Sequence, residues 1–109
     1  MKIRLLDTAL QDLMEGSDFY ERQEKDLGAY FLDSLFSDID SLLIYAGIHS
    51  IFFKAYYRLL SKRFPFAIYY RIDGNDVMVY AVLDCRRNPA WVRKRLKTVW
   101  IGAGDYRLK

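Results

Sequence analysis

The sequence predicts a single α+β domain in which a helical hairpin packs on one face of a small, mostly antiparallel sheet. Helix-spaced apolar residues fill much of the first half of the chain, whereas aromatic and β-branched residues concentrate between residues 55 and 83. A chain of 109 residues, 52% of them hydrophobic, is long enough for one packed core. The expected element order is β-α-α-β-β-β-α, with residues 1–100 as the domain and residues 101–109 as a C-terminal tail.

The chain is expected to begin with a strand and to continue into a helix. Residues 2–6 are compatible with a short strand. Asp7 or Thr8 can cap the helix that follows, because either side-chain oxygen can accept a hydrogen bond from a backbone amide. Apolar residues then recur at helical spacing to about residue 20, and acidic residues such as Asp12 are expected on the outer face.

A second helix is expected from Leu27 to Ala46, where apolar residues again recur three or four positions apart. Gly47 is suited to end it, since glycine tolerates the left-handed backbone conformation. The two helices are expected to pack as an antiparallel hairpin.

Three strands are expected in the second half, at residues 55–60, 66–72 and 77–83. The segment Asp73–Asp76 predicts a hairpin turn between the last two. Nearly every position from 77 to 83 is apolar, which predicts a central strand buried on both faces. Pro65 has no amide hydrogen, so it belongs at a strand start, an edge or a bulge. Asn88 and Pro89 then begin a short helix.

Charge is distributed unevenly along the chain. Residues 1–53 carry four Lys/Arg and ten Asp/Glu, and residues 54–109 carry thirteen Lys/Arg and four Asp/Glu, which gives net charges of −6 and +9. This asymmetry predicts a cationic face for an anionic partner, with nucleic acid as the first candidate; a solvated basic surface is the alternative. The arginines of the second half are expected on the sheet face opposite the hairpin.

Several classes of function are disfavoured by composition. One cysteine, Cys85, and one histidine, His49, provide neither a disulfide framework nor a metal site, and no cofactor is expected. Neither a signal sequence nor an apolar run of membrane-spanning length is evident. We therefore expect a soluble, cytoplasmic protein.

Several segments carry a family resemblance. The run from Arg58 to Arg71 (RLLSKRFPFAIYYR) and the later segment Asp84–Pro89 (DCRRNP) resemble the central signature of RelE/ParE-family toxins of type II toxin–antitoxin systems. Upstream, Ala9-x-x-Asp12-Leu13, Phe19-Tyr20-Glu21 and Leu27-Gly28-x-x-Phe31 are similar to the ParE-like branch. The resemblance extends from residue 2 to about residue 96.

The resemblance implies a toxin that inhibits growth, contributes to plasmid stabilisation and forms a heteromeric assembly with a cognate antitoxin. A ParE-like toxin inhibits DNA gyrase by binding. A RelE-like toxin is a ribosome-dependent endonuclease that cuts messenger RNA. A third possibility is an inactive homologue that serves as a binding module. The resemblance alone leaves open whether the chain is an enzyme.

The candidate site consists of charged residues in the second half. Asp84, Arg86 and Arg87 are the candidate catalytic residues, because arginine binds phosphate through two parallel hydrogen bonds and Asp84 could act as a base. If Arg58 and Lys62 share a strand, both point to the same side. The candidates for binding nucleic acid or another target are Arg58, Lys62, Arg63 and Arg71. The alternative is that these arginines pair with acidic residues of neighbouring helices.

Two departures from the family pattern disfavour RNA cleavage. Asp84 stands where many relatives have histidine, and Phe66 stands where several nucleases carry a phosphate-binding arginine. Asp84 next to two arginines is expected to be a weak base and to form an ion pair at the strand end. Cys85 lies beside the same arginines, which could lower its pKa. His49 is expected to be a surface loop residue.

A further group of cations lies in the last helix, at Arg93, Lys94, Arg95 and Lys97. These residues are expected to form a solvated face or to contact the antitoxin. The ParE-like interpretation, inhibition by binding, is favoured.

Overall fold

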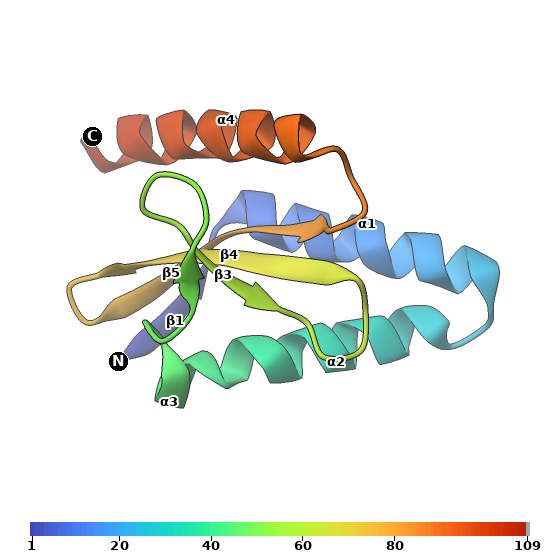
Figure 1. Cartoon of the computed structure of the whole chain (residues 1–109). Helices are drawn as coiled ribbons and strands as arrows, with labels where there is room; N and C mark the ends of the chain where they lie inside the picture. Colours follow the sequence, from blue (N-terminus) through green and yellow to red (C-terminus); the bar gives the residue numbers. More distant parts are fainter. Residues whose placement is uncertain (109) are drawn as a thin grey trace.

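The protein has three layers, a helical hairpin, a five-stranded sheet and a C-terminal helix, as Figure 1 shows. The computed structural model describes the backbone of residues 1–108 and the side chains of residues 1–100. The predicted α+β class is confirmed. The elements are β1 (Lys2–Leu5), α1 (Asp7–Gln23), α2 (Leu27–Asp40), α3 (Leu42–Tyr45), β2 (Ser50–Ile51), β3 (Tyr57–Leu60), β4 (Phe66–Asp73), β5 (Asp76–Asp84) and α4 (Pro89–Leu108).

The strands lie in the order β1-β5-β4-β3-β2. β1 pairs with β5 in parallel, and the other three pairs are antiparallel, so the predicted mostly antiparallel sheet is confirmed. A tight turn at Gly74, with φ of 61°, joins β4 to β5. β5 lies between β1 and β4 and is buried along most of its length, as its apolar sequence predicts.

The second predicted helix is interrupted at Ser41. The Ser41 hydroxyl donates to the backbone carbonyl of Asp38 at 2.6 Å, and this local hydrogen bond accompanies the break between α2 and the short α3. Gly47 follows with φ of 96°, consistent with its predicted role in ending the helical segment. The two-residue strand β2 was not predicted.

The last helix is longer than predicted, because α4 continues to Leu108. Lys109 and the side chains of residues 101–108 lie outside the described part of the chain, so the proposed boundary between a domain and a C-terminal tail stays a prediction. No helix in the described part is both long and apolar enough to cross a membrane.

The start of α1 differs from the prediction that Asp7 or Thr8 caps it. Leu6 occupies the N-cap position without a side-chain cap, and the Thr8 hydroxyl instead donates to the Tyr80 carbonyl at 2.8 Å. This contact has a structural reason. β1 ends beside Val79, whereas β5 continues to Asp84, so side chains of α1 satisfy backbone groups of β5 that have lost their strand partner.

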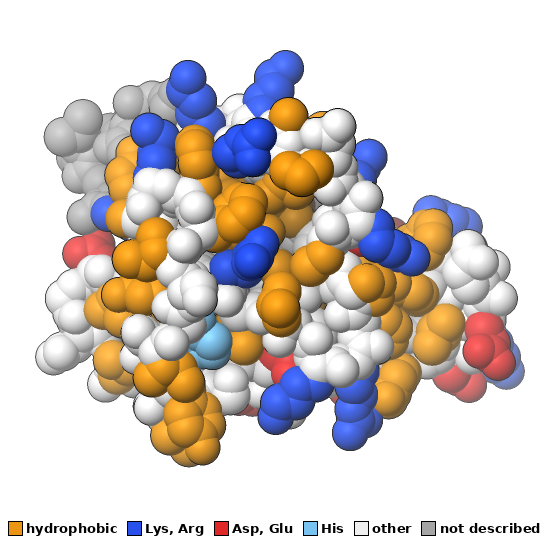
Figure 2. Space-filling model, in the orientation of Figure 1, with side chains coloured by type: hydrophobic (Ala, Val, Ile, Leu, Met, Phe, Trp, Pro, Cys, Tyr) orange, Lys and Arg blue, Asp and Glu red, His pale blue; other side chains and the backbone are white. Residues whose placement is uncertain are grey.

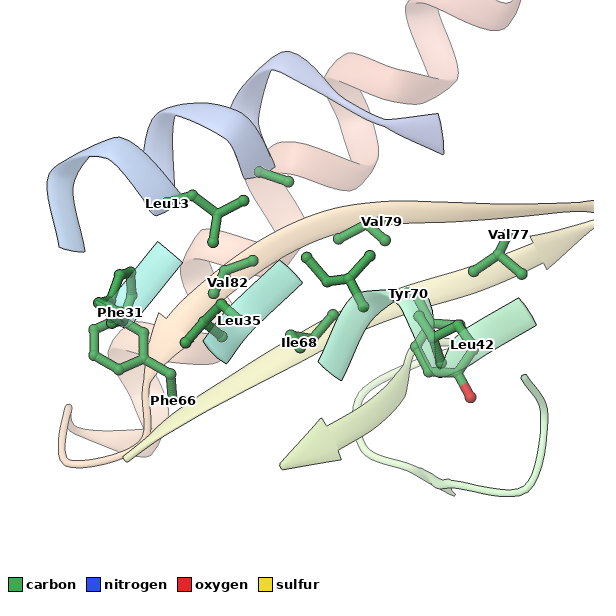
Figure 3. Packing of buried hydrophobic residues seen from close by; sticks show 12 residues of the cluster. Leu13, Phe31, Leu35, Leu42, Phe66, Ile68, Tyr70, Val77, Val79 and Val82 are labelled. Carbon is green, nitrogen blue, oxygen red and sulfur yellow. The ribbon is translucent and has the colours of Figure 1, made fainter. Parts of the chain in front are cut away.

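Apolar residues are buried on both faces of the sheet. One cluster lies between the hairpin and the sheet and includes Leu13, Phe31, Leu35, Ile68 and Val79 (Figure 3). The second cluster lies between the sheet and α4. It contains Tyr56, Ala67, Tyr69, Tyr80, Ala81, Leu83, Val92, Leu96 and Val99. The face that was expected to display arginines is therefore largely covered by α4, and only part of it is left for them.

Candidate functional site

The end of β5 holds an ion pair between two of the predicted catalytic residues. Arg86 donates from Nε to one oxygen of Asp84 at 3.0 Å and from Nη2 to the other at 2.7 Å. The backbone amide of Arg86 also donates to Asp84, at 2.8 Å. The hydrogen bonds from Arg86 lower the pKa of Asp84, and the same contact raises the pKa of Arg86. The predicted Asp84–arginine pair at the strand end is confirmed.

Four other predicted cations lie over aromatic rings. A planar guanidinium stacks favourably on such a ring, which fixes its position at a small entropic cost. One of these rings belongs to α2 and two belong to α4, on the opposite side of the sheet, so the cations do not converge on one phosphate site. The guanidinium carbon lies 4.6 Å from the ring centre of Phe52 for Arg58, 5.8 Å from that of Tyr30 for Arg63, 3.8 Å from that of Trp100 for Arg71 and 4.1 Å from that of Trp91 for Arg87.

Lys62 lies in the turn after β3, not within the strand. The backbone amide of Lys62 and the hydroxyl of Ser61 both donate to the buried carboxylate of Asp38, at 3.4 and 2.8 Å. The strand β3 ends at Leu60. The segment that follows it is held against α2 by these two hydrogen bonds to Asp38. Arg58 and Lys62 therefore do not share a strand, and the condition under which they would point to the same side is not met.

A second ion pair, missed in the sequence, joins three elements. Asp12 of α1 accepts from the Val82 amide of β5 at 3.0 Å and from Arg95 Nη2 of α4 at 2.7 Å. Asp12 is only 5% exposed, and burial raises its pKa to about 6, although the Val82 amide and the Arg95 guanidinium both lower it. The prediction that Asp12 faces outward is wrong, and Arg95 is a partly buried structural residue rather than part of a solvated face.

The spacing of Ala9, Asp12, Leu13 and Gly16 contained the missing signal. These four residues recur at helical intervals and all are buried on the inner side of α1. An aspartate within such an apolar stripe indicates a buried carboxylate that needs a partner.

His49 lies in the loop before β2, as predicted, and its ring contacts the sheet. His49 Nδ1 lies 2.5 Å from the hydroxyl oxygen of Tyr70, and the Gly47 amide donates to the same oxygen at 2.9 Å. Burial lowers the pKa of His49. Partial burial raises the pKa of Cys85 in spite of nearby Arg58, so the expected lowering is wrong.

Charge separates between the layers of the fold. Residues 7–40, which include the hairpin, carry ten Asp/Glu and two Lys/Arg, whereas residues 86–100 carry six Lys/Arg and no Asp/Glu. Figure 1 places these helices on opposite sides of the sheet, and in Figure 2 Lys and Arg side chains project from the α4 side at the top of the view. The acidic first half and the basic last helix of the sequence therefore lie on opposite sides of the folded molecule.

The described residues contain no group of three or more His, Cys, Asp or Glu side chains that could hold a metal ion. The site instead offers guanidinium groups fixed by aromatic rings and by one carboxylate. Such groups can bind anionic and planar partners.

A family model and a solved structure are similar to this chain. The model of the ParE toxin of the type II toxin–antitoxin system parDE matches residues 3–89. A solved structure from the chromosomal ParDE toxin–antitoxin system of P. aeruginosa is similar to this chain with a TM-score of 0.71 and 17% sequence identity, over 75% of this chain and 92% of that chain. At this identity the likeness shows the fold. No curated protein shows significant similarity to the sequence.

The matched region contains the hairpin, β2 to β5, all of β1 except Lys2, and the Asp84–Arg86 pair. Its fold and its family match define a toxin of the type II toxin–antitoxin class. The chain belongs to the ParE toxin family, the branch that the sequence pattern favoured.

Proposed function

We propose that this ParE-family toxin inhibits growth by binding DNA gyrase in the cytoplasm, and that a cognate antitoxin neutralises it. The observation that most supports binding over RNA cleavage is the ion pair at the end of β5. Asp84 engages Arg86 through both carboxylate oxygens, so these two groups stabilise each other. Neither is left unpaired to act on a substrate.

Cleavage of RNA needs a base that activates the 2′-hydroxyl and an acid that protonates the leaving oxygen. Asp84 is poorly suited to either task, because Arg86 lowers its pKa and thereby favours the ionised, weakly basic form. Phe66 pairs with Asp84 across the sheet and adds no charge for phosphate. His49 contacts Tyr70, and burial lowers its pKa. These features favour a toxin that binds its target.

An antitoxin partner is supported by the exposed apolar surface around α3. Leu43, Ile44 and Ile48 are all more than half exposed, and the segment 41–53 contains no Lys, Arg, Asp or Glu. Exposed apolar surface of this kind is typical of protein contact sites. The similar structure from P. aeruginosa is described as part of a ParDE toxin–antitoxin system.

The predicted site residues have separate proposed roles. Arg58, Arg63, Arg71 and Arg87, each placed over a ring, are proposed to contact the target or the antitoxin, and the same role is proposed for Lys62. The Asp84–Arg86 pair is proposed to fix the end of β5. Arg86→Ala should therefore lower toxicity only as far as it lowers the amount of folded protein.

The test is controlled expression in a bacterial host. We expect wild-type expression to stop growth and to induce the DNA-damage response while messenger RNAs remain intact. Co-expression of the antitoxin encoded beside the toxin gene should restore growth. Lys25→Gln, an exposed change on the hairpin connection, serves as the control and should be as toxic as wild type.

Other outcomes would identify the alternatives. Cleavage of messages on ribosomes that is lost in Arg86→Ala would indicate a RelE-like endonuclease and contradict the proposal. Normal growth with abundant soluble protein would indicate an inactive homologue that acts as a binding module.

A further inference from the structure

The outward face of α4 is strongly basic in its described part. Arg93, Lys94 and Lys97 are exposed, and none forms an ion pair with a described carboxylate. The segment Pro89–Trp100 contains no acidic residue. Arg87 adds a fourth cation just before the helix, where its guanidinium lies 4.1 Å from the Trp91 ring centre. We call Arg87, Arg93, Lys94 and Lys97 the α4 basic face.

We infer that the α4 basic face binds the phosphate backbone of duplex DNA without regard to base sequence. This inference goes beyond gyrase inhibition and does not depend on it, because DNA binding is measured with gyrase absent. The family match ends at residue 89, so the exposed cations of α4 lie outside the matched region.

The composition of this face favours nucleic acid over a protein partner. The centres of protein–protein interfaces are apolar and depleted in lysine, whereas interfaces with DNA are polar and positively charged. Besides its cations, the exposed side of the described part of α4 presents only Pro89, Ala90, Trp91 and Thr98. The exposed apolar surface of α3 belongs to a different element. A protein partner is better matched to α3, and an anionic backbone to α4.

The two ion pairs of the site do not neutralise any cation of the α4 basic face. Arg95, on the same helix, turns inward to Asp12, and Arg86 is bound by Asp84, so neither is counted among its cations. The acidic hairpin lies across the sheet from α4 (Figure 1). The electrostatic potential is therefore positive on the α4 side and negative on the hairpin side. DNA should approach from the α4 side, although the net charge of the chain is only +3.

The length of the face also suits a duplex. From Pro89, where the helix begins, to Lys97 the chain advances roughly 12 Å at 1.5 Å per helical residue. Because successive phosphates of one strand are spaced about 3.4 Å along the duplex axis, this length spans about three to four base-pair steps. Two to four phosphates are within its reach.

The experiment measures binding of the full-length chain to a fluorescein-labelled, mixed-sequence duplex of 24 base pairs by fluorescence anisotropy from 25 to 200 mM NaCl. The test variant is Arg93→Gln/Lys94→Gln/Lys97→Gln, which retains Asp12 and Arg95. The charge-matched control is Lys2→Gln/Arg22→Gln/Lys25→Gln, whose changes lie in β1, α1 and the connection between the hairpin helices. Glutamine is a good helix former, and thermal melting checks that each variant is folded.

We expect wild type to bind with an affinity that falls steeply with salt. The α4 variant should bind at least about tenfold more weakly at 25 mM NaCl, with a slope of log K against log[NaCl] smaller in magnitude by about 2 to 3, since each phosphate contact contributes about 0.9. The control should change the slope by less than about 1.

Three results would overturn the inference. Wild type could fail to bind DNA at 25 mM NaCl, or the control could reduce the slope as much as the α4 variant does, which would show an effect of net charge alone. The folded α4 variant could also keep DNA affinity and lose binding to the antitoxin, which would make the face a protein-docking surface. Gyrase inhibition is assayed separately, so its failure would leave this test unchanged.

Discussion

Asp12 is a buried carboxylate that connects three elements of the fold. Its two oxygens join the Val82 amide of β5 to the Arg95 guanidinium of α4, while its backbone belongs to α1. All three layers of the fold therefore meet at one carboxylate. Removing it would leave the Val82 amide and a partly buried guanidinium without their partner, which is more costly than the loss of a surface ion pair.

The pKa of Asp12 leads to a prediction about pH. Burial raises the pKa from 3.8 to about 6, so the folded protein holds this proton more tightly than the unfolded chain. The corresponding stabilisation is fully present below pH 3.8 and is lost as the pH rises through 6, with a total of about 3 kcal/mol. The measurement is the free energy of unfolding in urea at pH 3.5, 5 and 7, for wild type and Asp12→Asn.

The Asn variant is the control because it cannot titrate and still offers an amide oxygen to Val82. The free energy of unfolding of wild type minus that of Asp12→Asn should decrease from pH 3.5 to pH 7. A difference that increases over this range would mean that Arg95 lowers the pKa more than burial raises it, contrary to the prediction.

At the scale of single residues the sequence predicted a local contact better than long-range ones. It correctly paired Asp84 with an arginine, since the two lie two residues apart at a strand end. Asp12 and Arg95 are 83 residues apart, and no local pattern names one as the partner of the other. The contacts of Arg58, Arg63 and Arg71 with rings depend on tertiary packing in the same way.

Among the elements, the α1–α2 hairpin depends on a close approach at Gly28. The Gly28 amide donates to the Glu21 side chain at 2.9 Å, and its carbonyl accepts from the Ser17 hydroxyl at 3.2 Å. A Cβ added at Gly28 would lie 2.6 Å from the backbone oxygen of Ser17. The helices can therefore approach this closely only because residue 28 has no side chain.

Gly28→Ala should lower the free energy of unfolding by about 1–3 kcal/mol, because the added methyl group overpacks the hairpin. Helix propensity alone would predict the opposite sign, a gain of up to about 1 kcal/mol. The measurement is urea unfolding followed by circular dichroism. Ser37→Ala, at an exposed position of α2, is the control and should stay within about 0.5 kcal/mol of wild type. A stabilised Gly28→Ala protein would show that the helices can move apart without cost.

The hairpin and the three main strands could be predicted because their apolar periodicity is strong. The break at Ser41 and the short β2 could not, since both depend on local hydrogen bonds and edge pairing within an apolar segment. The N-cap was predicted wrongly because Thr8 bonds to β5 instead of to its own helix. A tertiary contact replaced the local preference at the N-cap, whereas a local side-chain hydrogen bond accompanies the break at Ser41.

For the whole molecule, α4 completes the second of two apolar clusters. Val92, Leu96 and Val99 pack with Tyr56 and Tyr80 of the sheet. The Tyr56 hydroxyl also donates to the Leu96 carbonyl at 3.0 Å. Trp100 packs against the same cluster.

Truncation tests this arrangement together with the proposed domain boundary. A chain ending at residue 100 should unfold cooperatively, because it keeps Val92, Leu96 and Val99 in the second cluster. A chain ending at residue 88 should be unfolded or aggregated, since it exposes the apolar face of the sheet. Thermal melting by circular dichroism and size-exclusion chromatography distinguish the two. A folded 1–88 fragment or an unfolded 1–100 fragment would contradict the prediction.

The sequence also predicted that acidic and basic residues would be separated in the fold. The prediction was possible because the acidic residues concentrate in the hairpin and the basic residues in the second half of the chain. It did not predict that α4 would cover the sheet face expected to display arginines. The exposed cations of the last helix therefore lie on its outward side. Arg71 lies between the sheet and this helix, against the ring of Trp100.

The central claim is that this ParE-family toxin acts by binding gyrase. The most direct measurement adds the purified chain to DNA gyrase, relaxed plasmid and ATP, and follows supercoiling on agarose gels. A parallel reaction contains translating ribosomes and a defined messenger RNA. The account predicts that supercoiling decreases as toxin is added, that antitoxin restores it, and that the message stays intact. Unaffected supercoiling together with a cleaved message would contradict it.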